Sequence, residues 1–301
     1  MRCLTCEQVK QKQTTAGDLD GITLFMTIPV HLELSKQSRR RRSRLARLYL
    51  EHERGAIAGG TLVILLLVWE AIGASGLVDP LFISSPTGVA RAAWLLSQRR
   101  DFWTDLQVSA TEFMLGYGAA LAVAIPLGLA LGLSKRLQYL IGPLVDTLNA
   151  VPRVTLLPLI IIWCGIGIWS KVVVVFLGAV IPILINAQSG VKASEARFIR
   201  VARSFSASRF KIFSSIILPG VVPFIFTGAK YGAGRALLGV VVGELYASTA
   251  GLGHLIADAG NTFQTDVVFV GALLFMAAGL IVVALLDVFE QRFERWRPSP
   301  R

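Results

Sequence analysis

The stretch RVARSFSASRFKIFSSIILP, residues 200–219, interrupts a strongly apolar part of the chain. It carries four basic residues and no acidic residue, and it ends on Pro219, where the next apolar run begins. Apolar runs lie on both sides of it, at residues 172–191 and 218–246. A short basic segment between two long apolar segments is typical of a cytoplasmic loop that joins two membrane-spanning helices.

The composition of the whole chain agrees with a membrane protein. Of the 301 residues, 54% are hydrophobic and 16% are charged, and the mean hydropathy is +0.63. This is too apolar for an ordinary soluble domain. A helix needs about 20 residues to cross a hydrocarbon core of roughly 30 Å. We therefore predict an all-α integral membrane protein with six transmembrane helices, at residues 56–78, 113–134, 137–170, 172–191, 218–246 and 267–286.

The distribution of Lys and Arg predicts the orientation, because these residues are retained on the cytoplasmic side. With the N-terminus inside, the inner segments hold twenty basic residues and the outer segments only four, Arg91, Arg99, Arg100 and Lys171. Both termini are therefore expected in the cytoplasm, with the chain in the cell membrane. The basic residues are expected to face anionic lipid headgroups, and no nucleic-acid-binding motif is visible. The predicted organisation is a basic tail at 1–54, a transmembrane domain at 55–290 with a loop at 190–218, and a C-terminal tail at 291–301.

The N-terminal tail contains little that could fold alone. Residues 1–35 are polar and have no helical pattern, so we expect a disordered segment whose first 25 residues are dispensable. Cys3 and Cys6 form a single C-x-x-C pair, which without further ligands is weak support for zinc. The three histidines are far apart, so no metal site is predicted. Cys164 lies in an apolar run and is expected to be a small buried residue.

The chain lacks the signature of an ATP-hydrolysing enzyme. A phosphate-binding loop of the form G-x-x-x-x-G-K-[ST] is absent, and the glycine-bearing stretches at 132–135 and 232–237 do not have its spacing. We therefore expect no catalytic residues, no cofactor and no ATPase site in this chain.

The quoted stretch has the features of a docking element. Residues 195–205 can form a short helix, and residues 206–208 supply a turn and a hydroxyl cap for a second helix that runs to residue 217. Small residues along these helices and the turn allow another backbone to approach closely, which suits insertion into a groove on a partner protein. The alternative is a basic amphipathic linker that rests on the lipid surface. The predicted apolar anchors are Phe205, Phe210, Ile212 and Phe213.

Read as E-A-A-x-x-x-G-x9-I-x-L-P, the same stretch resembles the loop signature of bacterial binding-protein-dependent ABC transporter permeases. It matches that signature at Ala202, Ile216, Leu218 and Pro219. Two further stretches are similar to the branch that imports nitrate, sulfonates, taurine and related solutes, and the whole resemblance covers residues 60–297. These stretches are NAVPRVTLLPLIIIWCGIGIWSK (149–171) and YGAGRALLGVVVGE (231–244).

Three positions depart from the signature. Arg200 stands in place of the glutamate, Val201 in place of the first alanine, and Ser206 in place of the glycine. The resemblance implies that this loop docks on a cytoplasmic ATP-binding subunit, and it also implies an extracytoplasmic solute-binding protein and a second copy of the permease. The residues implied in coupling to the ATPase are Arg200, Val201, Ala202, Ser206, Phe210, Phe213, Ile216, Leu218 and Pro219.

Ionisable residues inside the fifth predicted span suggest a polar passage. Lys230 and Arg235 lie roughly 16 Å and 24 Å along the helix from Pro219. A charge at the centre of a membrane helix costs at least ~2.5 kcal/mol unless it is paired or hydrated. One interpretation is an electropositive passage for an oxyanion, and the other is structural pairing of each cation with Glu244, Glu70 or a backbone carbonyl. The candidate passage residues are Asn149, Pro152, Arg153, Lys230, Arg235 and Glu244.

The expected function follows from the resemblance and the passage together. We expect the permease subunit of an ABC importer that acts as a dimer and carries a small oxyanion such as a sulfonate, taurine, nitrate or bicarbonate. Permeases similar to this one also carry thiamine precursors or other small organic molecules, so that alternative stays open. A secondary transporter without an ATPase, and a membrane scaffold that transports nothing, are the alternatives from other classes.

Overall fold

The computed structural model describes residues 55, 57–75, 79, 81–194 and 196–293. The chain divides after Leu65 into two units, and of the first unit only the beginning of the helix Ile57–Ala74 is described. The predictions for Cys3, Cys6 and the rest of the N-terminal tail therefore lie outside the described residues, as does most of the C-terminal tail.

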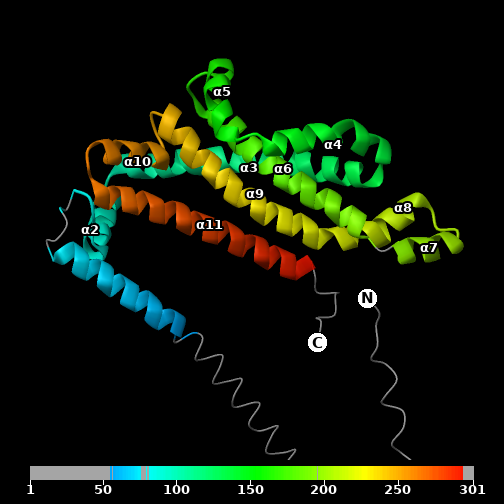
Figure 1. Ribbon diagram of the computed structural model, residues 1–301, viewed down its shortest axis with the longest axis horizontal. Coiled ribbons are helices and arrows are strands. Elements are labelled where there is room, and N and C mark those ends of the chain that lie inside the picture. The colour runs from blue at the N-terminus through cyan, green and yellow to red at the C-terminus, as the bar shows by residue number, and fades with distance from the viewer. Residues whose placement is uncertain (1–54, 56, 76–78, 80, 195, 294–301) are drawn as a thin grey trace, which may run out of the picture. The chain divides into compact units, whose positions relative to one another are not determined.

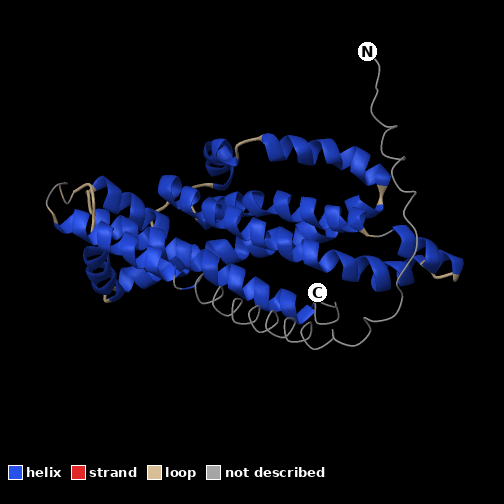
Figure 2. Cartoon of the chain, turned by 60° about the horizontal axis from the view of Figure 1, so that its bottom comes forward, coloured by secondary structure: helices blue, strands red, loops and turns tan. Residues whose placement is uncertain are grey.

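Every regular element in the described part of the chain is a helix (Figure 1), and short loops join the helices (Figure 2). This confirms the predicted all-α fold. In chain order after Ile57–Ala74 the elements are α2 (Pro86–Ser97), α3 (Arg100–Leu133), α4 (Lys135–Ala150), the 3-10 helix η1 (Arg153–Leu156), α5 (Leu157–Cys164), α6 (Ile168–Ala193), α7 (Ala196–Ser204), α8 (Arg209–Ile212), the π-helix η2 (Phe213–Ile217), α9 (Leu218–Ala247), α10 (Leu252–Asn261) and α11 (Thr265–Phe293).

The described helices include five that are long and apolar enough to cross a membrane, or six if one bent pair counts as a single span. The predicted number of six agrees with the second count. The bounds differ most at two spans, because α3 begins at Arg100 and not at residue 113, and the helix of the fifth predicted span begins at Arg209 and not at residue 218. The five helices are Ile57–Ala74, Arg100–Leu133, Ile168–Ala193, Arg209–Tyr246 and Thr265–Phe293.

The bent pair covers most of the span expected at residues 137–170. Lys135–Ala150 and Val154–Cys164 meet at an angle of 90°. Val151 and Pro152 between them have extended backbone, since proline lacks the N–H that would continue the helix and disfavours helical backbone in the residue before it. The bend also corrects the expectation for Cys164, which is exposed rather than buried because it ends α5.

The core of the larger unit is made by α3, α6 and α9, with α6 packed along both of the others. Glycine allows these close contacts. A Cβ on Gly116 of α3 would lie 2.6 Å from the Cβ of Val175, and a Cβ on Gly178 of α6 would lie 2.9 Å from the carbonyl oxygen of Arg235. Small residues at helix interfaces are how membrane helices approach closely without a hydrophobic driving force. α11 packs on α9, α10 and α2 (Figure 1).

Glu70 has a structural role at the N-terminus of α2. Its two carboxylate oxygens accept hydrogen bonds from the backbone N–H and the hydroxyl of Thr87, at 3.0 and 2.7 Å. Trp69 beside it donates its indole N–H to the carbonyl oxygen of Ser84 at 2.7 Å. An acidic group near the first turn of a helix is stabilised by the unpaired N–H groups there. Glu70 therefore fixes α2, and it is not the partner of Lys230 or Arg235.

Candidate functional site

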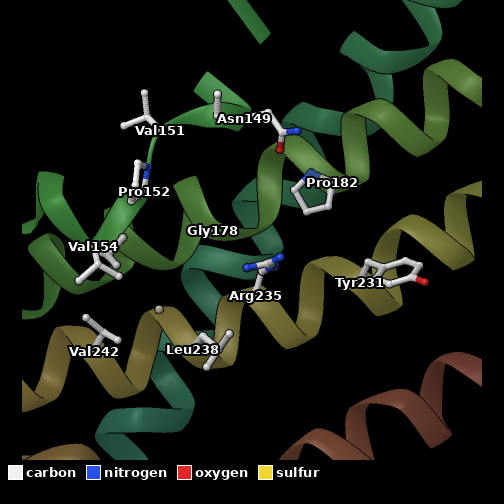
Figure 3. A pocket seen from close by; sticks show the side chains of 13 residues that line it. Asn149, Val151, Pro152, Val154, Gly178, Pro182, Tyr231, Arg235, Leu238 and Val242 are labelled. Atoms are coloured by element: carbon white, nitrogen blue, oxygen red, sulfur yellow. The ribbon is translucent and has the colours of Figure 1, made fainter. Parts of the chain in front are cut away.

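A cavity of about 530 Å³ lies where the break between α4 and α5 faces α6 and α9. Figure 3 shows Arg235 projecting from α9 toward the side of the cavity that holds Asn149 and Pro152. The volume is within the range of sites that hold small molecules, roughly 300–1,000 Å³. The lining residues that the argument below uses are Asn149, Pro152, Val154, Tyr231, Arg235 and Leu238.

Local backbone features build each wall. The extended residues at the end of α4 open one wall, because a continuous helix would fill the space with side chains. The opposite wall is one face of α9, where Tyr231, Arg235 and Leu238 recur at spacings of four and three residues. The close contact at Gly178 brings the backbone of α6 against Arg235 and forms the floor.

Among the lining side chains that the structure describes, Arg235 carries the formal charge, and the others are amide, phenol or apolar groups. Its guanidinium offers a planar fork of N–H donors that matches an oxyanion. The structure thus brings together three of the predicted passage residues, Asn149, Pro152 and Arg235. The side chain of Arg153, a fourth, lies outside the described residues.

Lys230 does not line this cavity. Its ammonium group contacts the carboxylates of Asp287 and Glu290 on α11. The side chain is 26% exposed, and the two acids bind α11 to α9. Lys230 and Arg235 are five residues apart, which turns their side chains about 140° from each other around the helix axis.

We expect Lys230→Met to leave the apparent KM of transport unchanged and to weaken the contact between α9 and α11 slightly. Partly exposed ion pairs contribute about 0.2–1 kcal/mol, so the loss should appear as a small drop in the unfolding midpoint of the purified protein. A variant that also carries Asp287→Asn and Glu290→Gln is the matched control, because it removes the acids left unpaired. A severalfold change in the apparent KM of transport would show instead that Lys230 is part of the solute passage.

Glu244 is also away from the cavity, buried under the loop at residues 248–251. Its carboxylate accepts a hydrogen bond from the hydroxyl of Ser109 at 2.6 Å and another from the backbone N–H of Gly253 at 2.6 Å. Glu112 and Lys171 complete a buried polar cluster around it. Sequence reasoning missed both, because Glu112 lies just before the predicted second span and Lys171 was assigned to an outer segment.

The segment predicted to dock on a partner is a pair of short helices beyond the junction of α6 and α9 (Figure 1). Ile212, Ile217 and Val221 form its buried core together with Val191 of α6, and Phe213 packs against this core. Phe205 and Phe210 are instead 82% and 78% exposed. Of the two aromatic residues assigned to coupling, Phe210 is thus available to a partner, and Phe213 mainly supports the segment.

The remaining coupling candidates divide in the same way. Ala202 and Ile216 pack against the core of the segment, and Pro219 is half-buried in the first turn of α9. The exposed candidates on the segment are Arg200, Val201, Ser206 and Leu218.

The turn between α7 and α8 explains why the signature has glycine at the position of Ser206. Its φ is 55°, its N–H donates to the carbonyl oxygen of Arg203 at 2.9 Å, and the next N–H, of Ala207, donates to that of Ala202 at 3.0 Å. This is the helix-ending turn in which glycine is favoured, which is the residue that the signature has here. The hydroxyl that caps α8 comes from Ser208, which accepts from the N–H of Lys211 at 3.3 Å.

We expect Ser206→Gly to stabilise the protein by up to about 1 kcal/mol. The left-handed backbone costs a residue with a side chain roughly 1–2 kcal/mol, and the added freedom of glycine in the unfolded chain offsets about half of this. The control is Ser208→Ala, which removes a helix cap and should destabilise by about 1 kcal/mol. Denaturant titration of the purified protein measures both, and a loss of stability in Ser206→Gly would contradict the account of the turn.

Comparison with known proteins adds an independent result. Residues 124–295 match the family described as binding-protein-dependent transport system inner membrane component. The chain is 34% identical to the taurine transport system permease protein TauC of Escherichia coli over 242 residues, which cover 79% of this chain and 88% of that protein. It is 30% identical to the putative aliphatic sulfonates transport permease protein SsuC of Bacillus subtilis, with 78% and 86% covered, and 31% identical to SsuC of Escherichia coli, with 78% and 89% covered.

Proposed function

Since this chain belongs to the family of inner membrane components of binding-protein-dependent transport systems, we propose that it carries short aliphatic sulfonates through the cavity at Arg235. The chain is the permease subunit of an ABC importer for oxyanion-type solutes. The observation that supports the choice of solute is the cavity itself, in which one guanidinium lies among amide, phenol and apolar groups.

The chemistry of the lining favours an anion with an apolar tail. The fork of Arg235 binds two oxygens of a sulfonate, with the amide of Asn149 on the same cavity. Val154 and Leu238 offer apolar surface to an alkyl chain. Taurine carries an ammonium group in addition, and no described lining side chain is a carboxylate that would receive it. An amine-free sulfonate therefore fits this cavity better than taurine does.

The proposed partners are two cytoplasmic ATP-binding subunits, an extracytoplasmic solute-binding protein and a second copy of this chain. The second copy would cover the open side of the cavity, where Tyr231 and Leu238 are exposed. Exposed apolar residues continue along α4 and α5 at Leu140 and Trp163. Membrane lipid is the expected neighbour of the exposed apolar face of α11, where Leu280 is one of the residues.

The connection from the docking segment to the cavity supports a mechanism for coupling. α8, η2 and α9 follow one another without a loop, so the chain is helical from Arg209 to Arg235. A displacement of α8 by the ATP-binding subunit is therefore transmitted along α9 to the guanidinium. The π-turn at η2 is the point in this path where the regular hydrogen-bond pattern changes.

The proposed orientation places both termini in the cytoplasm and the docking segment on the same side. Reporter fusions after Ser134 and after Ser194 should give a cytoplasmic signal, and a fusion after Gly253 should give a signal from the other side. The reason is the retention of basic residues inside. An external signal at Ser194 would contradict the docking role of residues 190–218.

The proposed function is tested with the full-length chain in proteoliposomes that contain its ATP-binding subunit, with the solute-binding protein added outside. We expect ATP-dependent uptake of a short alkanesulfonate at a higher kcat/KM than that of taurine. Nitrate, bicarbonate and a thiamine precursor are the comparison solutes. Preferred uptake of any of these would overturn the choice of a sulfonate, and uptake without ATP would indicate a secondary transporter.

A further inference from the structure

A buried ionic cluster lies outside the cavity, where α3, α6 and α9 meet the loop at residues 248–251. It consists of Glu112, Lys171 and Glu244, one from each of these helices, with exposed fractions of 0%, 5% and 0%. Two acids and one base are therefore buried together. If all three were ionised, the cluster would hold one uncompensated negative charge, which is costly in a buried site.

The surroundings of Glu244 favour its ionised form. One of its oxygens accepts a hydrogen bond from the hydroxyl of Ser109 at 2.6 Å, and the other accepts a hydrogen bond from the backbone N–H of Gly253 at 2.6 Å. Gly253 lies in the first turn of α10, where unpaired N–H groups and the helix dipole stabilise a negative charge. The loop is fitted to this carboxylate, because a Cβ on Gly253 would lie 2.7 Å from the Cβ of Glu244.

The surroundings of Glu112 do not favour its ionised form. Its oxygens accept no hydrogen bond from the described residues, although the ammonium of Lys171 lies 3.2 Å from one of them. Lys171 donates over a shorter distance, 2.7 Å, to the hydroxyl of Ser248. Glu112 lies three residues after Ser109 on the same face of α3, and Ser109 binds Glu244, so the two carboxyl groups are neighbours. A buried carboxylate needs several donors, whereas a neutral carboxylic acid needs one acceptor for its O–H.

We infer that Glu112 is protonated and donates its O–H to the carboxylate of Glu244, which makes the cluster neutral with Lys171 and Glu244 as its two charges. Glu112 is then a positioning residue. It joins α3 to Glu244, and Glu244 holds the start of α10 together with Ser109, whose oxygen accepts the N–H of Leu252 at 2.8 Å.

Further titratable groups lie beside the loop at residues 248–251. Asp105 of α3 accepts the N–H of Gly251 at 2.8 Å, and His254 of α10 contacts Asp258 at 3.3 Å. Each therefore has a partner of its own, and neither is needed to balance the charges of the cluster.

The test compares Glu112→Gln with Glu244→Gln in the full-length permease assembled with its ATP-binding subunits. A glutamine at 112 can accept from Lys171 and donate to Glu244, as the neutral acid does, so assembly and uptake should stay within twofold of the parent protein. Glu244→Gln leaves the charge of Lys171 uncompensated, and assembly or uptake should fall at least tenfold. The opposite ranking, or a tenfold loss in both variants, would overturn the inference.

Two further measurements decide the matter if Glu244→Gln does not assemble. The infrared band of a protonated carboxylic acid should be present in the parent protein at neutral pH and lost in Glu112→Gln, and an unchanged band would overturn the inference. Adding Glu244→Gln to Lys171→Met should improve assembly over Lys171→Met alone, while adding Glu112→Gln should not. The reverse would place the proton on Glu244. Neither the infrared band nor the assembly of the complex depends on which solute is carried. A failure of the proposed function can therefore be distinguished from a failure of the inference about Glu112.

Discussion

Replacing Arg235 by alanine should lower the kcat/KM of ATP-driven uptake about 10- to 100-fold while the complex still assembles. Hydrogen bonds to charged groups contribute about 1.5–3 kcal/mol, and removing the bidentate donor leaves the oxyanion with the neutral amide of Asn149 and phenol of Tyr231 in the described lining. The residue is exposed on its own chain, so its loss opens no void in the core. Uptake measured with labelled alkanesulfonate, with the amount of assembled complex determined separately, gives the effect.

Two variants make the result specific. Arg235→Lys keeps the positive charge without the fork, so it should lie between the parent protein and Arg235→Ala. Arg91→Ala removes an exposed cation of α2, far in sequence from the cavity lining, and should leave uptake unchanged. If Arg235→Ala transports as well as the parent protein, the cavity at α9 is not the solute path.

Replacing Phe205 and Phe210 together by alanine should weaken binding of the ATP-binding subunit at least 100-fold. Both rings are exposed, Phe205 directly after α7 and Phe210 in α8, although burial of aromatic side chains is strongly favourable. Aromatic residues that insert into a pocket of a partner cost 2 kcal/mol or more when truncated, and two such losses correspond to about 4 kcal/mol. Co-purification and transport-linked ATP hydrolysis measure the loss.

Phe213→Ala is the matched control, since its ring packs inside the segment against Ile212, Ile217 and Val221. It should lower the stability of the permease by more than the paired change at Phe205 and Phe210 does, because it leaves a gap among packed side chains. If the paired variant binds the ATP-binding subunit as tightly as the parent protein, the segment is a helix resting on lipid.

Several features could be predicted from local sequence because their causes are local. The lengths of the apolar runs predict the membrane-spanning helices, since about 20 residues are needed in any context. The turn at Ser206 and the cap at Ser208 depend on residues within one helical turn. The 90° bend could be predicted only in part, because Pro152 disfavours a continuous helix, but the angle depends on the packing of α5 against α6.

The roles of the ionisable residues could not be predicted in the same way. Lys230 and Arg235 look equivalent in the sequence, yet the acids that contact Lys230 are on α11, more than 50 residues later in the chain. The ion pair between Glu112 and Lys171 is apparent only in the tertiary structure, because it depends on the packing of α3 against α6.

The sequence by itself determined that this chain is a set of membrane helices with a basic segment between two of them, because hydropathy, helix length and turn chemistry act over neighbouring residues. The tertiary structure alone decided that Arg235 faces a cavity, that Lys230 binds α11 and that Glu244 lies in a buried cluster. Helical periodicity shows which residues share a face of α9. Which of these faces lines a cavity depends on the helices that pack against α9. Close contacts at glycines such as Gly178 set that packing, and the partners involved are distant in the chain.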